Sequence, residues 1–251
     1  MIERITSKQN EWIKRAASLR DRKYRALYGA YLVEGQRAVR DTMAGGGPVK
    51  LFLSQAFIDK NPDAFADVDF AVTAAEAFDK LTDTDAPQGV AAIFEIPKPE
   101  RLYQSAYCLF LENVRDPGNL GTILRTALAA GFFEVYLCGC CDAFNPKSVR
   151  SAVSAVAKLK IYEAQRAELD KLKGLGYTLV CGDMCGENVF KAAFPAKKYC
   201  LMIGSEADGL SDEARRLADL TIGIPMRGDI ESLNAAVSAG ILLYQIARGS
   251  E

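Results

Sequence analysis

The stretch ENVRDPGNLGTILRTALAAGF, residues 112–132, is the most informative part of the chain for the fold. It continues the apolar segment YCLFLENV, which predicts a buried strand over residues 107–114, and then breaks at an Asp-Pro-Gly turn. Small and apolar residues then predict a helix over 120–131. Asn119 and Arg125 belong to this segment, and each is costly to bury without a partner. Because open α/β sheets bind ligands at the carboxyl ends of their strands, this pattern predicts a ligand site.

Apolar strand segments alternate with helical segments from residue 107 to the end of the chain. The predicted strands are YCLFLENV, EVYLCG, LKIYE, YTLVCGD, YCLMIG and LTIGIPM, and the predicted helices cover 120–131, 146–158, 165–174, 211–218 and about 233–247. This order is typical of a mainly parallel sheet with helices on both faces.

The N-terminal part predicts a separate, smaller α/β domain. Residues 7–27 have the pattern of an amphipathic basic helix or helix pair, and VKLFLS, FAVT and GVAAIFEI have that of strands. Residues 97–106, PKPERLYQSA, contain two prolines and predict a linker. We therefore expect one domain over residues 1–98 and a second over 105–251.

Two further loops in the second domain resemble the first in position and composition. IGSEADGLS, residues 203–211, and IPMRGDIESLNAAVSAGILLYQ, residues 224–245, each follow a predicted strand and carry glycine and polar residues. Taken singly, these residues also fit structural roles, as a Pro-Gly turn and as helix caps at Asn119, Ser211 and Asp212. Structural roles do not explain three such loops in one domain, so together they predict a single site.

The composition excludes several classes of protein. The 251 residues include no histidine, which excludes a His general base and any His metal ligand. No apolar run approaches the roughly 18 residues of a membrane span, and the N-terminus lacks the apolar core of a signal peptide, so we expect a cytoplasmic protein. Seven cysteines favour reduced thiols over disulfides. The cysteines of LCGCCD and Cys181-x3-Cys185 lack paired zinc-site spacing.

A net charge of −1 hides a basic N-terminal arm. Residues 1–40 hold ten Lys and Arg against four acidic residues. Such an excess suits a segment that binds a polyanion, since phosphate contacts dominate affinity for nucleic acids. A solvated helix face accounts for the same charges equally well.

The three loops, in this order, closely resemble the motifs of SpoU-type RNA 2′-O-ribose methyltransferases of the SPOUT superfamily. Residues 107–251 match the catalytic domain, and residues 4–95, with ITSKQN, YLVEGQRAVRD and APQGVAAI, resemble the L30e-like substrate-binding domain that precedes it. The resemblance implies a SPOUT α/β-knot domain with a C-terminal trefoil knot, and a homodimer that meets through the last helix. Small residues of that helix would permit close approach, although they equally suit a contact within the chain: Ala235, Ala236, Ala239 and Gly240.

The same resemblance implies roles for individual residues. Arg125 is the central catalytic residue, and Asn119, Glu206, Ser232 and Asn234 support it. The cofactor is S-adenosyl-L-methionine, held by backbone groups of Gly204, Ile224, Met226 and Leu233. The expected substrate is a structured RNA, ribosomal rather than transfer RNA, and the expected RNA-binding residues are Lys8, Arg22, Lys23, Arg37, Lys147 and Arg150. Asn145, Lys147 and Arg150 also fit a helix cap and a solvated basic face.

The chain departs from the family pattern at three places. Ser154 and Ala207 stand where the family usually has glycine, and Ala235-Ala236 replaces a frequent Val-Ser pair. None of these changes removes an expected catalytic group. Ser154 is larger than glycine and would narrow the groove near the target nucleotide, so the family pattern does not predict which nucleotide is modified. Two other functions are considered: a non-catalytic RNA-binding protein on the same fold, and a small-molecule methyltransferase, which would leave the basic arm without a use.

Overall fold

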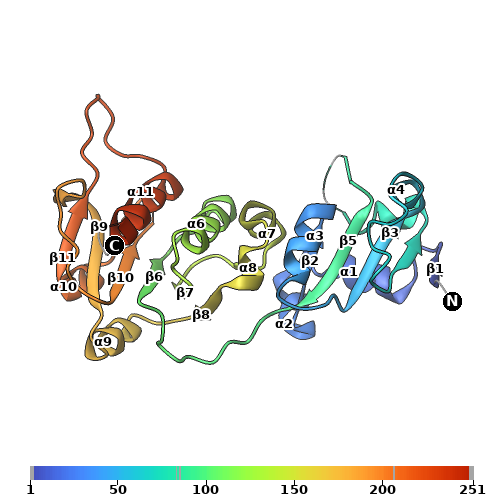
Figure 1. Ribbon diagram of the computed structural model, residues 1–251, viewed down its shortest axis with the longest axis horizontal. Helices are drawn as coiled ribbons and strands as arrows, with labels where there is room; N and C mark the ends of the chain where they lie inside the picture. Colours follow the sequence, from blue (N-terminus) through green and yellow to red (C-terminus); the bar gives the residue numbers. More distant parts are fainter. Residues whose placement is uncertain (1–2, 83, 85, 206, 249–251) are drawn as a thin grey trace. The chain divides into compact units, whose positions relative to one another are not determined.

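The computed structural model describes residues 3–82, 84, 86–205 and 207–248. It divides into two compact units, drawn in Figure 1. The first unit comprises Met1–Ile96 and Phe144–Ala157, and the second comprises Pro97–Ala143 and Lys158–Glu251. The segment Phe144–Ala157, which the sequence pattern assigns to the C-terminal domain, thus packs with the N-terminal residues.

The first unit is built on a mixed five-stranded sheet. β4 pairs in parallel with β1 and β3, and β5 pairs antiparallel with β2 and β3, giving the order β1-β4-β3-β5-β2. The strands are β1 (Glu3–Ile5), β2 (Ala30–Glu34), β3 (Lys50–Ser54), β4 (Ala71–Thr73) and β5 (Val90–Glu95). The helices are α1 (Glu11–Ser18), α2 (Arg22–Tyr28), α3 (Gln36–Met43), α4 (Gln55–Lys60), α5 (Ala75–Phe78), α7 (Pro146–Ala152) and α8 (Ala155–Lys158), which ends at the boundary of the unit.

The basic N-terminal segment forms a pair of helices, one of the two arrangements predicted for residues 7–27. Asn10 caps α1 and Asp21 caps α2, each accepting a backbone hydrogen bond from the second residue beyond it. Ile13 and Ala16 are buried in the core of the unit, so the amphipathic pattern is confirmed.

The second unit is built on a six-stranded sheet whose strand pairs are all parallel, in the order β11-β9-β10-β6-β7-β8. The predicted mainly parallel sheet is therefore confirmed. Its strands are β6 (Tyr107–Glu112), β7 (Glu134–Cys138), β8 (Lys160–Glu163), β9 (Thr178–Asn188), β10 (Tyr199–Ile203) and β11 (Leu220–Gly223). Its helices are α6 (Pro117–Ala129), α9 (Ala167–Gly174), α10 (Asp212–Leu217) and α11 (Ala235–Arg248).

Helices cover both faces of this sheet. Phe110 and Met202 pack in one cluster with Leu169 and Leu172 of α9. Because side chains alternate along a strand, the intervening residues of β6 and β10 point to the opposite face, where α11 contacts β10 and packs against α6. The strands are apolar at nearly every position because they are buried on both faces. Among the described residues no helix has the length and apolar character needed to cross a membrane.

Several predicted element boundaries are wrong, and the largest strand error is at β9, which continues to Asn188 instead of ending at Asp183. The helix expected over 146–158 is divided into α7 and α8, because Val153 adopts a φ of 58°, which interrupts helical hydrogen bonding. The strand expected through Met226 ends at Gly223, and the helix expected from 120 begins at Pro117. Pro117 suits the first turn of a helix because its missing N–H would have no partner there.

The predicted linker, residues 97–106, contains no helix or strand and all of it is described. It is nevertheless attached to the second unit. Arg101 and Tyr103 both bond to the carboxylate of Glu168 on α9, each over 2.6 Å. The Glu168 side chain is only 4% exposed, so these bonds satisfy a buried charge.

Candidate active site

The first motif opens α6 with a cap that we did not predict. The Asp116 side chain accepts a hydrogen bond of 2.8 Å from the backbone N–H of Asn119. Asp116 is therefore the N-cap of α6, and the expectation that Asn119 caps this helix is wrong. Asn119 lies in the first turn instead, where its side chain can act outside the helix.

The first and third motifs meet through a pair of asparagines. The Asn234 Nδ2 donates a hydrogen bond of 3.0 Å to Asn119 Oδ1. The Asn234 Oδ1 accepts a bond of 2.9 Å from the backbone N–H of Ala236, so Asn234 also caps the start of α11. One side chain thus fixes the start of α11 against the start of α6 and brings the two predicted residues into direct contact.

Arg125 lies on the exposed face of α6. The sequence pattern indicates a mostly buried helix, and Arg125 lies at one of its exposed positions. Its neighbours Leu124 and Ile123 are fully buried and occupy the inner face. Arg125 makes no hydrogen bond or ion pair with any of the described residues, so its charge is available to an anionic ligand.

The second motif forms a tight loop after β10. Ser205 and Gly209 exchange backbone hydrogen bonds of 3.0 and 3.2 Å. A Cβ atom on Gly204 would lie 1.9 Å from the Gly209 carbonyl carbon, so only glycine fits at position 204. Glu206, one of the expected supporting residues, lies outside the described residues.

A buried carboxylate that we did not single out holds this loop in place. Glu112, at the end of β6, is 0% exposed. It accepts bonds from the Ser211 backbone N–H at 2.8 Å, the Ser211 hydroxyl at 3.0 Å and the Arg166 guanidinium. Burial raises the pKa of Glu112, but these three donors outweigh burial and hold its pKa below the ordinary value. The sequence offered one signal for this role: Glu112 is an acidic residue at the end of an apolar strand, directly before the first motif.

The third motif lines a cavity in the second unit. The space among its lining residues is about 450 Å³, part of it open to solvent, which falls within the size range of small-molecule sites. The predicted residues Ile224, Met226, Ser232 and Leu233 line it, whereas Gly204 does not. The other lining residues are Gly182, Asp183, Met184, Ile203, Ile222, Gly223, Ser238 and Leu242.

This cavity fits the expected cofactor, S-adenosylmethionine. Its walls are mainly aliphatic, as a purine ring requires, and Asp183 adds one carboxylate. Residues 224–234, all described, lie between β11 and α11 as an irregular loop, so their backbone N–H and C=O groups stand outside any sheet ladder or helix. Those backbone groups can recognise the polar edges of the ligand.

All six expected RNA-binding residues are exposed and belong to the first unit. Lys8 pairs with Glu76 at 3.3 Å and Arg37 with Asp41 at 3.7 Å. Exposed pairs of this kind are weak, so they leave both cations available to RNA. Asn145 accepts a bond of 2.9 Å from the Lys147 backbone N–H, which makes Asn145 the cap of α7.

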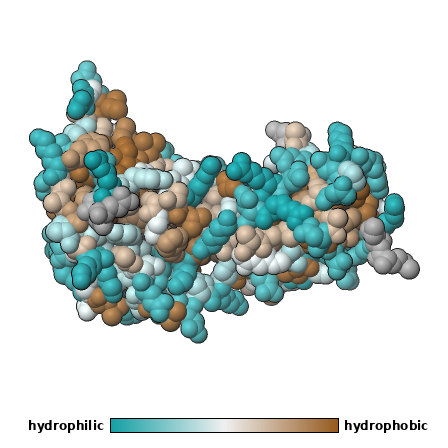
Figure 2. All heavy atoms as spheres, viewed as in Figure 1, coloured by the Kyte–Doolittle hydropathy of each residue, from teal (hydrophilic) through white to brown (hydrophobic). Residues whose placement is uncertain are grey.

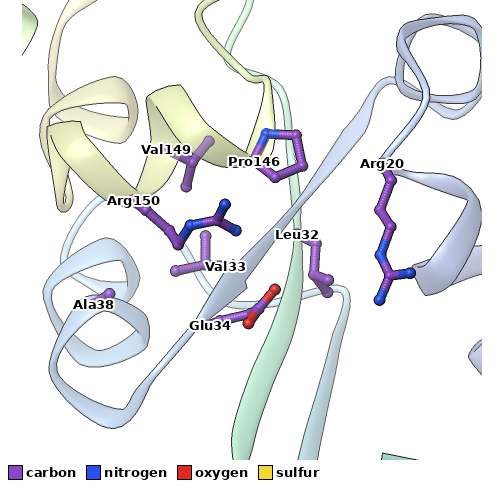
Figure 3. A pocket seen from close by; sticks show the side chains of 8 residues that line it. All are labelled: Arg20, Leu32, Val33, Glu34, Ala38, Pro146, Val149 and Arg150. Carbon is purple, nitrogen blue, oxygen red and sulfur yellow. The ribbon is translucent and has the colours of Figure 1, made fainter. Parts of the chain in front are cut away.

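Arg150 lies beside a small pocket of the first unit. Its side chain and that of Glu34 lie between α7 and the end of β2 (Figure 3). Arg20, across β2, donates a bond of 3.2 Å to the Lys80 backbone carbonyl. The remaining lining residues are Leu32, Val33, Ala38, Pro146 and Val149.

The small residues of α11 are used within the chain. Ala235, Ala236 and Ala239 are all buried, which favours the intramolecular alternative for these three. The exposed side of α11 instead carries Val237 and Tyr244, each 52% exposed and seven residues apart on one helical face. Figure 2 shows hydrophobic residues gathered on this side of the second unit, around α11 and the loop that precedes it.

None of the seven cysteines forms a disulfide bond. Burial raises the pKa of the Cys140 thiol to about 12, which keeps it protonated and unreactive near neutral pH. Within the described part of the chain, no group of three or more Cys, Asp or Glu side chains is placed to hold a metal ion.

Comparison with known families identifies the class of protein. Residues 106–244 match the SpoU rRNA Methylase family, and residues 10–92 match the MRM3-like substrate binding domain. The chain belongs to the SpoU rRNA methylase family, as the three motifs indicated.

Individual relatives extend over nearly the whole chain. The 23S rRNA (guanosine(2553)-2′-O)-methyltransferase RlmP of Bacillus subtilis is 30% identical over 98% of this chain and 99% of its own length. The 23S rRNA (uridine(2479)-2′-O)-methyltransferase of Streptomyces viridochromogenes is 30% identical over 98% of this chain and 92% of its own. The crystal structure of the AdoMet-bound rRNA methyltransferase from Sinorhizobium meliloti is 29% identical, with a TM-score of 0.84 over 98% of both chains. These similarities agree with the expected enzyme class and cofactor.

Proposed function

We propose that this protein transfers a methyl group from S-adenosylmethionine to a ribose 2′-hydroxyl of ribosomal RNA. The observation that carries the proposal is the Asn119–Asn234 bond, which joins the first motif to the motif that lines the cofactor cavity. The names of the relatives support both the donor and the acceptor.

The chemistry needs alignment, charge stabilisation and an acceptor for the 2′-hydroxyl proton. Bound S-adenosylmethionine supplies an electrophilic methyl group on a sulfonium. Arg125 keeps its charge at all relevant pH values and is therefore a poor base. Its guanidinium holds the nucleotide phosphate and stabilises the developing 2′-alkoxide, while a phosphate oxygen or solvent takes the proton. Asn119, Glu206, Ser232 and Asn234 position the reacting groups.

The C-terminal trefoil knot expected from the family is part of the proposal. The match to the SpoU family model supports it. In the same region, the paired strands β9 and β11 approach each other closely where their register shifts. A Cβ on Gly186 would lie 2.4 Å from Ile222 backbone atoms, and one on Gly223 would lie 2.7 Å from the Asp183 carbonyl oxygen. Glycine is needed at both positions because a side chain would not fit between the backbones of the two paired strands.

The domain division and the dimer also belong to the proposal. We assign residues 1–98 to an L30e-like domain that selects the RNA and residues 105–251 to the catalytic domain. The catalytic domains form a homodimer through α11, whose exposed Val237 and Tyr244 supply an apolar face. We also assign the enzyme to the cytoplasm, and the bacterial rRNA methyltransferases among its relatives support this location.

The test uses the purified full chain, methyl-labelled S-adenosylmethionine and total RNA from a strain that lacks this gene. We expect one alkali-resistant 2′-O-methyl position, in ribosomal RNA. Label in transfer RNA would instead identify transfer RNA as the methyl acceptor and overturn the proposal of ribosomal RNA. No label, with cofactor binding established by calorimetry and assembly intermediates also tested, would favour the non-catalytic RNA-binding alternative.

A further inference from the structure

The helix pair α1–α2 is held rigidly by a buried arginine. Arg25 is only 2% exposed and donates bonds of 2.7 and 2.8 Å to the backbone carbonyls of Leu19 and Arg20, at the end of α1. These carbonyls lie where a helix leaves its own acceptors unpaired, so a cation is favoured there. The side chains on the outside of the two helices therefore have fixed relative positions.

Cations and aromatic rings lie in contact along this surface. The Arg15 guanidinium lies 5.3 Å from the Trp12 ring centre and 4.8 Å from that of Tyr28. Tyr28 stacks on Tyr24, with ring centres 6.2 Å apart and an interplanar angle of 18°, and Lys23 Nζ lies 5.7 Å from the Tyr24 ring. We name these five residues, Trp12, Arg15, Tyr28, Tyr24 and Lys23, the cation–aromatic row.

The row has features that a purely structural cluster does not need. Its inner end is fixed, because Trp12 packs against the core of the unit. Its outer end is open, because Tyr28 is 40% exposed and Lys23 is exposed. Tyr28 follows Leu27, which is 67% exposed, so the end of α2 presents a ring and an aliphatic side chain to solvent.

The positive charge at the centre of the row is not neutralised. The Arg15 guanidinium makes no ion pair with the described residues, and its Nε is buried without a hydrogen-bond partner. Asp21, the acidic residue next to α2, is engaged in capping that helix through the Lys23 backbone N–H. A guanidinium held between two rings keeps its charge and its N–H donors available to an external acceptor.

We infer that the cation–aromatic row binds an unpaired segment of the RNA substrate, with bases stacked on Tyr28 and Tyr24 and phosphates held by Arg15 and Lys23. This inference rests on the proposed function. Unpaired bases stack on aromatic rings and arginine planes, whereas bases in a duplex are already stacked on each other. Rings and cations side by side suit the bases and phosphates of a single strand. The row therefore gives the first unit a preference for single-stranded regions.

The test compares the binding of a 12-nucleotide single-stranded RNA and a blunt 12-base-pair RNA duplex to the full chain by fluorescence anisotropy. We expect Tyr28→Leu to weaken binding of the single strand about tenfold and to change duplex binding less than twofold. Tyr28→Phe, which keeps the ring, is expected to bind like the wild type. Leu27→Ala is the matched control on the same turn and is also expected to bind normally.

A second variant tests the phosphate contact. Arg15→Ala is expected to weaken single-strand binding and to reduce the slope of log affinity against log salt by about 0.7. Lys60→Ala, an exposed lysine on α4, is the charge control and should leave both unchanged. Equal binding by Tyr28→Leu and wild type, or equal losses for Tyr28→Leu and Tyr28→Phe with an unchanged thermal transition, would overturn the inference.

Methyl transfer separates this inference from the proposed function. With ribosomal RNA as substrate, Tyr28→Leu is expected to raise KM for RNA about tenfold and to leave kcat and cofactor affinity within twofold. A normal KM for RNA in this variant would overturn the inference that the cation–aromatic row binds RNA, and would leave the proposed methyltransferase activity unaffected. The wild type could instead bind RNA in a manner that depends on the Tyr28 ring but transfer no methyl group. That outcome would overturn the proposed function and support the inference about the cation–aromatic row.

Discussion

Asn234 donates a hydrogen bond of 3.0 Å to Asn119 across 115 positions of sequence. The same Asn234 side chain caps α11 through the Ala236 backbone N–H. The start of α6 and the start of α11 are thus fixed by one residue, and the loop that lines the cofactor cavity ends at that point. A change at either asparagine should therefore affect both stability and catalysis.

A double-mutant cycle measures this link. Asn234→Ala is expected to lower the free energy of unfolding by about 1–2 kcal/mol, because it removes a helix cap and one side-chain bond. Asn119→Ala removes the bond to Asn234 but leaves the cap of α11 intact, and should cost about 0.5–1 kcal/mol. In urea denaturation the double variant should lose about 0.5 kcal/mol less than the sum of the single changes. Strict additivity would contradict a direct bond between the two side chains.

Arg125→Ala is expected to reduce methyl transfer at least about a hundredfold, because it removes the cation that stabilises the 2′-alkoxide. Cofactor affinity, measured by calorimetry, should stay within a few-fold, since Arg125 does not line the cavity. Arg216→Ala, an exposed arginine on α10, should keep normal turnover and serves as the control. Full turnover by Arg125→Ala would refute the role given to this residue.

The sequence predicted the second unit well because its main signal is local. Strands buried on both faces must be apolar along nearly their whole length, and β6 and β10 are, with Glu112 at the end of β6 as the exception. The motif loops were located for a related reason, since each directly follows such a strand. The division of the helix at Val153 could not be predicted, because a β-branched residue is among the least expected at positive φ.

Long-range relationships were the other limit of sequence reasoning. Glu112 acquires its role from Ser211, which lies 99 positions away, and no local pattern reports that pairing. The packing of residues 144–157 with the first unit depends likewise on contacts such as Tyr31 with Phe144, at a ring distance of 5.0 Å. The exposure of Arg125 was missed because its apolar neighbours suggested a helix buried on all sides.

Glu112→Gln is expected to lower the free energy of unfolding by about 2–3 kcal/mol at pH 7, because it removes a buried charge that three donors stabilise. Its folded-state pKa lies below the ordinary value of about 4.3, so the native protein binds fewer protons there than the unfolded chain. The stabilisation is therefore present above pH 4.3 and is lost as pH falls through the folded-state pKa.

Stability measured between pH 3 and 6 should fall less steeply for Glu112→Gln than for the wild type. Glu213→Gln is the control, because Glu213 also contacts Arg166, at 3.6 Å, but is 61% exposed. That variant should change stability by less than about 1 kcal/mol. Identical pH profiles for Glu112→Gln and the wild type would exclude the charged state of Glu112 as the stabilising form.

Glu168→Ala is expected to release the segment 97–106 from α9, because Arg101 and Tyr103 both lose their buried acceptor. Limited trypsin digestion should then cleave after Arg101 several times faster than in the wild type. Asp170→Ala, an exposed change on the same helix, should leave the cleavage rate unaltered. A segment that stays equally resistant in Glu168→Ala would mean that other contacts hold it.

The proposed dimer predicts an effect of charge on α11. Val237→Arg, alone or with Tyr244→Arg, places a cation on the exposed apolar face and should halve the molar mass measured by light scattering. Leu175→Arg is the matched control, because Leu175 is 46% exposed and follows α9, which packs on the opposite face of the sheet. If Val237→Arg remains dimeric while Leu175→Arg dissociates, the contact lies on the α9 side and α11 is free.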